Sequence, residues 1–351
     1  MNAETPLSTS PTQTRQWAPN AEIMMFVVLV LLMLFSLRLG RYPISLPHIV
    51  QALWDTHQVT TQQHNNWVII NIIRLPRIAG VALCGMGLGL AGTTLQGVFR
   101  NPLVGPEICG VSAGATFGGS LALVLGGSMV IVIGLAFSCG MLALIIAILL
   151  SCLSKSRSTL PLILSGVIVG GFFSSLTGLI QYVADPQIQL PSIIYWLLGS
   201  FVGMTWNKVA LLASVTLVCG TLLLLLRWRL NLLSLDETDA QTLGLHVEKL
   251  RWSVIALSAL LVAAQIAVSG CVGFAGLIVP HLTRMVVGPE HTRLLPASAC
   301  FGGIYLLLVD DLARSLTTQE IPIGLLTSFI GAPIFAWLFW KVQQQGAQHV
   351  G

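Results

Sequence analysis

The chain has 351 residues, of which only 9% are charged and 55% are hydrophobic, and its mean hydropathy is +0.85. Soluble domains need about 25% charged residues to cover their surface, so this composition excludes a soluble cytosolic enzyme and a nucleic-acid-binding protein. The net charge of +4 says little about partners, because the positions of the basic residues matter more than their sum. The sequence therefore predicts a polytopic protein surrounded by the lipid bilayer.

The first 20 residues are polar and rich in Ser, Thr, Gln and Pro. They lack a basic stretch leading into a small-residue cleavage site, so we expect a disordered cytoplasmic tail over residues 1–20 instead of a cleaved signal peptide. One transmembrane domain is expected over residues 21–345. A short cytoplasmic tail is expected over residues 346–351.

Apolar segments follow one another along the rest of the chain, and a helix needs about 20 such residues to cross the hydrocarbon core. Strict alternation of apolar and polar residues is absent from them, which favours an all-α fold. A further stretch, residues 191–201, is too short to span and is expected as a partial helix. The ten predicted spans are residues 22–39, 67–97, 108–127, 129–152, 160–183, 206–228, 252–269, 273–287, 295–312 and 322–342.

The distribution of Lys and Arg predicts the orientation of these ten spans. With the N-terminus in the cytoplasm, 11 of the 17 basic residues fall in inner loops and tails. Because inner loops usually carry the excess of Lys and Arg, both termini are expected in the cytoplasm. The 6 exceptions fall outside or near the outer face: Arg38, Arg41, Arg74, Arg77, Lys208 and Arg314.

Glycines and cysteines in the spans are interpreted as packing residues. Residues 87–92 formally contain the dinucleotide pattern G-x-G-x-x-G, but they lie in an apolar helix with no preceding strand. The pairs Gly85/Gly89 and Gly166/Gly170 have the spacing that lets membrane helices approach closely. The seven cysteines are odd in number and lack a C-x-x-C pair, which is typical of small packing residues. His281 and His291 are ten residues apart without a nearby ligand, so no metal site is expected.

Two polar segments suggest partner surfaces. Arg74 and Arg77 lie three residues apart near the outer end of the second span, where charged groups are costly and often functional. Snorkelling of the two side chains toward the lipid headgroups is the alternative. The inner loop 235–251 holds a predicted short helix from about 237 to 243, with Asp236 as N-cap and Gly244 ending it. A helix with polar residues beside Ala240 and Leu243 favours a docking surface for a cytosolic partner. A solvated linker is the alternative.

Four blocks together carry a family resemblance: Arg74-Leu-Pro-Arg77, residues 95–115 with their Asn-Pro and Gly-Pro breaks, the loop 235–251, and residues 273–284 with the later 310–314, 321–324 and 331–333. Over roughly residues 24–343 the chain resembles the FecCD family of bacterial permeases, the membrane subunits of type II ATP-binding-cassette (ABC) importers. The resemblance implies a type II importer fold of ten spans in the bacterial inner membrane. It also implies a second copy of the chain or a close homologue, two cytosolic ATPase subunits and a periplasmic substrate-binding protein.

The resemblance assigns roles to particular positions. Arg74, Arg77 and Arg314 match outer arginines that receive acidic residues of the binding protein. The inner loop 230–251 matches the element that couples the permease to the ATPase, through Asp236, Glu237, Ala240, Leu243 and Gly244. Ser158 and Thr159 match the cytoplasmic gate. Two departures from the family pattern are Leu160-Pro161 and Val104-Gly105-Pro106-Glu107.

These inferences predict a translocation subunit without catalytic residues or a cofactor of its own. The chain has no G-x-x-x-x-G-K-[ST] loop, so ATP and Mg are expected on the partner ATPase. The cargo expected from the resemblance is a metal chelate, first a ferric siderophore, with haem, cobalamin and molybdate as alternatives. An ion-coupled secondary transporter is disfavoured, because acidic residues of the spans such as Asp310 and Asp311 lie toward the ends and no buried carboxylate is expected.

Overall fold

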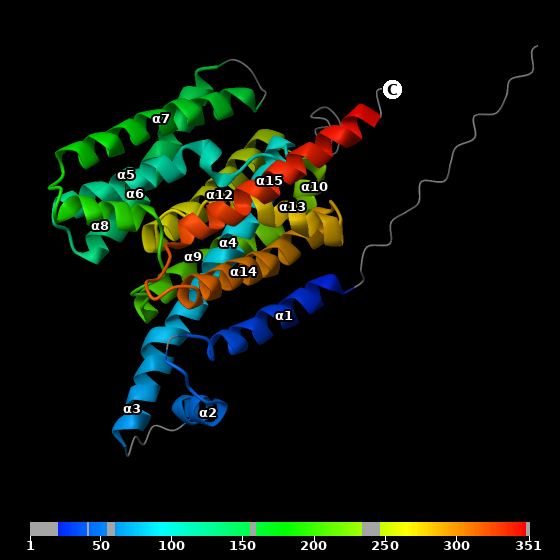
Figure 1. Cartoon of the computed structure of the whole chain (residues 1–351). Coiled ribbons are helices and arrows are strands. Elements are labelled where there is room, and N and C mark those ends of the chain that lie inside the picture. Colours follow the sequence, from blue (N-terminus) through cyan, green and yellow to red (C-terminus); the bar gives the residue numbers. More distant parts are fainter. Residues whose placement is uncertain (1–19, 41, 55–59, 155–158, 234–245, 349–351) are drawn as a thin grey trace, which may run out of the picture.

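The computed structural model describes residues 20–348 except 41, 55–59, 155–158 and 234–245, and every element in this part of the chain is a helix (Figure 1). The predicted all-α membrane fold is confirmed. An apolar helix overlaps each of the ten predicted spans. These helices are α1 (Ala21–Ser36), α4 (Leu75–Phe99), α5 (Val111–Val124), α6 (Met129–Cys152), α7 (Leu160–Val183), α9 (Trp206–Leu225), α12 (Val247–Ser269), α13 (Ala275–Val287), α14 (His291–Ser315) and α15 (Ile323–Gln348).

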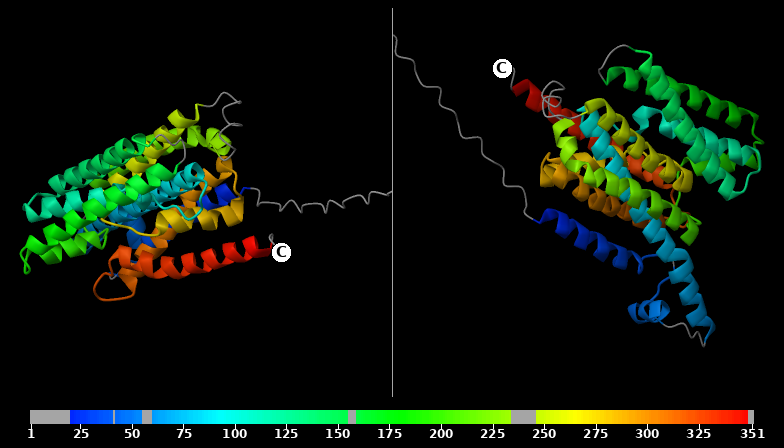
Figure 2. Two further views of the ribbon diagram at one scale, coloured as in Figure 1. Left: turned by 90° about the horizontal axis from the view of Figure 1, so that it is seen from above. Right: turned by 180° about the vertical axis from the view of Figure 1, so that it is seen from behind.

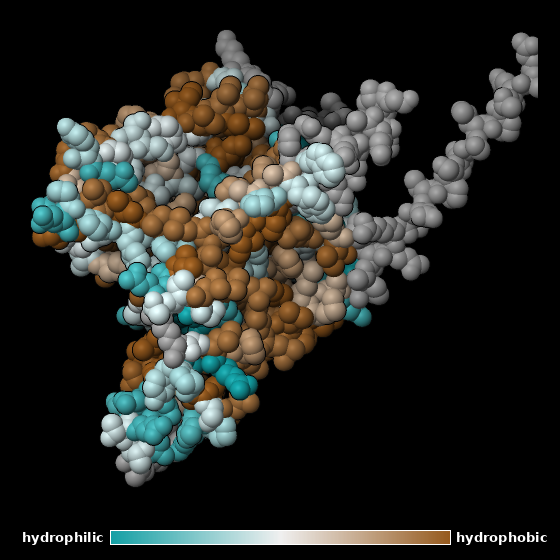
Figure 3. All heavy atoms as spheres, viewed as in Figure 1, coloured by the Kyte–Doolittle hydropathy of each residue, from teal (hydrophilic) through white to brown (hydrophobic). Residues whose placement is uncertain are grey.

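Within the described part of the chain, six helical stretches are long and apolar enough to cross a membrane: the continuous Thr61–Phe99, α6, α7, α9, α12 and α14. Shorter apolar stretches occupy α1, α5, α13 and the Ile323–Trp337 part of α15. The predicted partial helix is present as α8 (Gln189–Leu197), and a short helix α10 (Arg227–Leu233) follows α9. Many large apolar side chains remain exposed on α6, α7 and α9, as expected of surfaces that face lipid. Figure 3 shows extensive hydrophobic surface on one side of the molecule.

Helix α4 lies in the middle of the bundle, against α9, α12, α13 and α14 (Figure 1). The glycines of α4 allow the neighbouring helices to pack closely around it. A Cβ on Gly85 would lie 2.2 Å from the Gly302 carbonyl oxygen, and one on Gly92 would lie 1.7 Å from that of Gly276. The prediction that these glycines serve helix packing is confirmed, since only a residue without a side chain allows such backbone approach.

Helices α5, α6 and α7 pack on one another as a second group, drawn in green tones in both views of Figure 2. Gly166 of α7 lies against the backbone of the short η2 helix (Pro106–Cys109), where an added Cβ would meet the Ile108 oxygen at 2.0 Å. Gly170 has a looser contact, with the Gly110 Cα 3.9 Å from its ideal Cβ. The predicted close approach is therefore confirmed most clearly at Gly166.

The chain between the first two spans contains helices that the sequence analysis left out. Thr60 and Gln63 form a reciprocal capping box that starts α3 (Thr61–Val68). A π-helical segment, η1 (Ile69–Arg74), continues α3 into α4, and α2 (Leu46–Trp54) packs beside them. Figure 1 shows α2 and α3 extending beyond the bundle. We call the end of the bundle nearest them the outer end, after the predicted orientation.

Helix α12 ends at a junction of three chain segments. Gly270, with φ of 73°, ends the helix. A Cβ added to Gly270 would lie 2.1 Å from the Trp196 oxygen. The Ser200 amide donates to the Ser269 oxygen at 2.8 Å. The Gly324 amide, at the start of α15, donates to the Leu198 oxygen at 2.9 Å. These hydrogen bonds satisfy backbone N–H and C=O groups that lie outside the helices. Such groups need partners within the protein because an apolar environment offers none.

Candidate functional site

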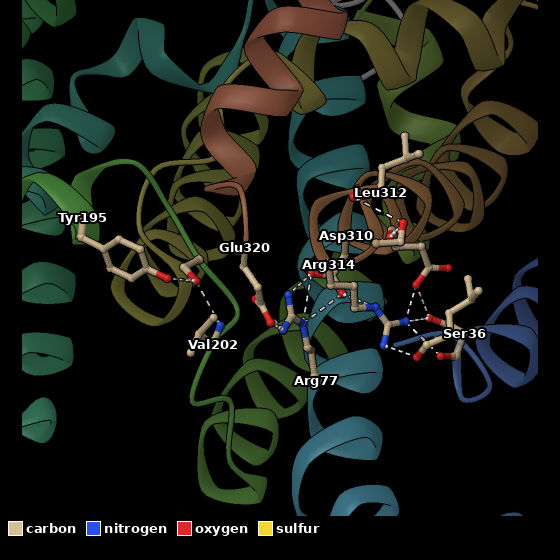
Figure 4. Close-up of polar contacts among 12 residues, drawn as sticks. Ser36, Arg77, Tyr195, Val202, Asp310, Leu312, Arg314 and Glu320 are labelled. Atoms are coloured by element: carbon tan, nitrogen blue, oxygen red, sulfur yellow. Dashed lines mark hydrogen bonds and ion pairs between the residues drawn. The ribbon is translucent and has the colours of Figure 1, made fainter. Parts of the chain in front are cut away.

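A cluster of charged residues lies at the outer end, where α1, α4, α14 and the segment before α15 meet (Figure 4). It contains three arginines and three carboxylates of formally zero total charge. We call it the outer charge cluster: Arg74, Arg77, Arg314, Asp310, Asp311 and Glu320, with Ser36 of α1 beside them.

Arg77 is held by two carboxylates. Its Nε donates to both oxygens of Asp310 at 3.1 Å, and its Nη2 donates to Asp310 Oδ1 at 2.8 Å. Its Nη1 lies 2.8 Å from Glu320 Oε2. Asp310 is fully buried, so this multidentate pairing is what compensates the loss of its hydration.

Arg314 completes the cluster on the side of α1. Its Nη2 donates to Asp311 Oδ1 and, at 2.9 Å, to the Ser36 carbonyl oxygen. Its Nε lies 3.7 Å from Asp310 Oδ2, which links it to the Arg77 pair. The Ser36 hydroxyl also donates to Asp311 at 2.5 Å. The end of α1 is thereby attached to α14.

Arg74 has a different environment from the other two arginines. Its Nη1 donates to the Leu37 oxygen at 2.7 Å and its Nη2 to the Tyr42 oxygen, and it forms no ion pair with a described carboxylate. An added Cβ on Gly40 would lie 2.8 Å from Arg74 Nη2. Arg74 therefore fixes the connection that follows α1.

The structure corrects two premises of the sequence analysis. On the family resemblance we expected carboxylates of the binding protein to pair with the outer arginines, but Arg77 and Arg314 already have acidic partners within this chain. We also expected no buried carboxylate, whereas Asp310 is 0% exposed. The pairing was missed because Arg77 and Asp310 are 233 residues apart. The three arginines are only 5–8% exposed, so a partner protein could reach them only at the edge of the cluster.

At the opposite, inner end the predicted gate and coupling residues are described only in part. Thr159 is the N-cap residue of α7 and is partly buried. Ser158 lies outside the described residues. The same holds for the predicted coupling residues Asp236, Glu237, Ala240, Leu243 and Gly244.

The helices on either side of residues 234–245 are attached to the bundle. Arg100, at the end of α4, donates from Nε to the Leu233 oxygen at 2.9 Å. Asn231 of α10 accepts from the His291 amide at 2.7 Å. Leu230 and Val247 are buried on the two flanks. Helix α10, which precedes residues 234–245, is therefore attached to both α4 and α14.

Residues 104–107, the departure noted above, reach far into the bundle. Pro106 packs on Gly276 at the start of α13, where an added Cβ would lie 2.5 Å from Pro106 Cγ. A small cavity there is lined by Glu107, Gln265 of α12 and Leu88, near the middle of α4. The break follows the inner end of α4, but the returning η2 segment carries it to mid-helix depth. Nothing in the local pattern indicates that depth.

Buried charges, helices interrupted inside the bundle and an apolar outer surface define a multi-pass α-helical membrane protein of the transporter class. The chain matches the FecCD transport family over residues 28–341 and belongs to this family. It is 47% identical over 322 residues to the molybdate import system permease protein MolB of Haemophilus influenzae, covering 91% of this chain and 95% of that protein. It is 35% identical to the hemin transport system permease protein HmuU of Yersinia pestis, covering 92% and 95%.

A solved structure described as an inward-facing conformation of an ABC transporter assigned to the metal-chelate type has the same fold. The TM-score is 0.83 at 44% identity, with 92% of this chain and 100% of that chain covered. Together with the family match, this makes the chain an ABC importer permease of the FecCD family.

Proposed function

We propose that this permease moves an oxyanion of the molybdate class across the bacterial inner membrane. The observation that carries the proposal is the 47% identity to a molybdate permease, against 35% to a haem permease and 36% to a ferric citrate permease of Bacillus subtilis, at similar coverage. A metal chelate, including the ferric siderophore expected from the sequence, is the second candidate. The 44% identity to the metal-chelate type structure favours it.

The proposed assembly contains this chain and a second copy or close homologue, two cytosolic ATPase subunits and a periplasmic binding protein. ATP and Mg are bound by the ATPase subunits, and the permease itself holds no cofactor and catalyses no reaction. Both termini lie in the cytoplasm in this arrangement. The sequence contains no G-x-x-x-x-G-K-[ST] loop, which supports a subunit whose energy source is supplied by a partner.

Asp236, Glu237, Ala240, Leu243 and Gly244 are proposed to contact the ATPase. The attachment of Leu233 to Arg100 and of Asn231 to His291 supports this role, because it connects the loop to α4 and α14. ATP-driven movement of the loop would then reach the two helices that pack most closely in the bundle.

Ser158 and Thr159 are proposed as the cytoplasmic gate, at the start of α7. Arg74, Arg77 and Arg314 are proposed to take part in docking of the binding protein at the outer end. Glu320 supports a modified form of this role, since its side chain is 26% exposed and its carboxylate pairs with Arg77. An acidic residue of the binding protein would compete with Glu320 for the Arg77 guanidinium.

The test is uptake into proteoliposomes that contain the permease with the ATPase and binding protein that copurify with it. Internal molybdenum and iron are measured by mass spectrometry after addition of ATP with molybdate, with a ferric hydroxamate, or with both. ATP-dependent accumulation of molybdenum alone supports the proposal. Accumulation of iron alone establishes the chelate alternative, and ATP-independent uptake contradicts the importer assembly.

A further inference from the structure

Lys208 is a basic residue at the outer end that does not belong to the outer charge cluster. It lies in the first turn of α9, and its Nζ donates to the Gly203 oxygen at 3.0 Å. It forms no ion pair with any carboxylate in the described part of the chain. An ammonium group has three donors, so two of those on Lys208 remain available to another acceptor.

Lys208 lines an open groove of about 440 Å³ between the starts of α6 and α9. Its walls are apolar, formed by Met129, Val130 and Ile133 of α6 and by Leu211 of α9. Val130 is 79% exposed, which is unusual for a large apolar residue unless lipid or another protein covers it. Of the described residues that line the groove, none is acidic.

Trp206 indicates the expected depth of the groove, at the level where lipid headgroups meet acyl chains. Both helices begin at the outer end. Trp206, between the lining residues Thr205 and Asn207, is half-exposed, and its Nε1 donates to the Asn71 oxygen at 2.9 Å. Partly exposed tryptophans with one polar contact are typical of the interface between water and hydrocarbon. The apolar walls therefore run from this interface toward the membrane interior.

We propose that this groove binds one anionic glycerophospholipid. Its phosphate accepts hydrogen bonds from Lys208 Nζ and from the side-chain amide of Asn207, while one acyl chain lies along Val130, Ile133 and Leu211. A single uncompensated cation beside apolar walls complements an anionic headgroup joined to a hydrocarbon tail. A zwitterionic lipid offers the same tail without the net negative charge, so the groove prefers phosphatidylglycerol to phosphatidylcholine.

The experiment is native mass spectrometry of the full-length permease, delipidated in detergent and titrated with phosphatidylglycerol or phosphatidylcholine. We expect one phosphatidylglycerol per chain to bind more tightly than phosphatidylcholine. Lys208→Gln should raise the Kd of the first bound phosphatidylglycerol about fivefold, because one lysine near an anionic headgroup contributes about 1 kcal/mol. Arg38→Gln removes an exposed cation from the same end, outside the groove, and should leave this affinity unchanged.

Leu211→Trp fills the groove while Lys208 stays in place, and should abolish the preference for phosphatidylglycerol. A photoreactive residue in place of Val130, in membranes, should crosslink to phospholipid. The proposal is overturned if wild-type protein binds both lipids equally, if Lys208→Gln binds phosphatidylglycerol like wild type, or if the crosslink at position 130 is to a protein. These outcomes do not depend on the transported cargo.

Discussion

Arg77 near the start of α4 and Asp310 near the end of α14 form a multidentate ion pair at 2.8–3.1 Å, although 233 residues separate them in the chain. Asp310 is fully buried and Arg77 is 8% exposed. The pair joins the outer ends of two helices whose glycines already bring their backbones together. It therefore sets the position of α14 along α4 at the outer end.

Arg77→Met should lower the free energy of unfolding by about 3–5 kcal/mol, because it leaves the Asp310 carboxylate buried without its main partner. The measurement is equilibrium unfolding in mixed micelles. The double variant Arg77→Met/Asp310→Leu should recover most of the loss. Arg293→Gln removes a pair with Glu22 whose side chains are 31% and 34% exposed, and should cost less than about 1 kcal/mol. Equal losses from Arg77→Met and Arg293→Gln would contradict the structural role of the buried pair.

Gly85→Ala should destabilise the protein by about 1–3 kcal/mol or more, because its Cβ would lie 2.2 Å from the Gly302 oxygen and would force α4 and α14 apart. The matched control is Gly134→Ala in α6, whose Cβ would meet nothing within 4 Å. That control should be neutral or stabilising by up to about 1 kcal/mol. Thermal unfolding of the two variants in the same detergent checks the difference. A neutral Gly85→Ala would show that the helices are not in this close contact.

Glu320→Gln should strengthen docking of the binding protein, because it removes the carboxylate that competes for Arg77. We expect a Kd about fivefold lower, the equivalent of about 1 kcal/mol for one partly exposed charge contact. The Kd is measured from binding of the binding protein to immobilised permease at low ionic strength. Glu290→Gln, at the inner end, is the control. If Glu320→Gln leaves the Kd unchanged, Arg77 does not receive a carboxylate of the binding protein.

Thr159→Cys, in a background that lacks the seven native cysteines, should form a disulfide between two permease copies when the pathway is closed on the inside. This requires a Cα separation under about 7 Å. The crosslink is followed on non-reducing gels in nucleotide-free, ATP-bound and binding-protein-bound states. Leu153→Cys, at an 81% exposed position near the same end, should not crosslink. Absence of the Thr159 crosslink in every state would remove this residue from the gate, and its presence in every state would show a static contact.

The helical spans and their glycine packing could be predicted from the sequence because both depend on short stretches of chain. Length and hydropathy define each apolar helix, and glycines spaced four residues apart, such as Gly85 and Gly89, mark a face on which another helix can approach. The motifs of residues 74–77, 95–115, 235–251 and 273–333 together indicated the family. The proposed roles of Thr159 and of the loop 234–245 stay predictions.

Tertiary structure decided which charges meet and how deep each loop lies. The identities of Arg77, Asp310 and Glu320 do not say which carboxylate pairs with which arginine, because every acidic residue offers the same oxygens and only the packing of α4 against α14 brings one pair together. In the same way, Glu107 follows a Gly-Pro turn that reads locally as a surface loop. It reaches the middle of α4 because Gly276 leaves space for Pro106, a contact between segments 170 residues apart.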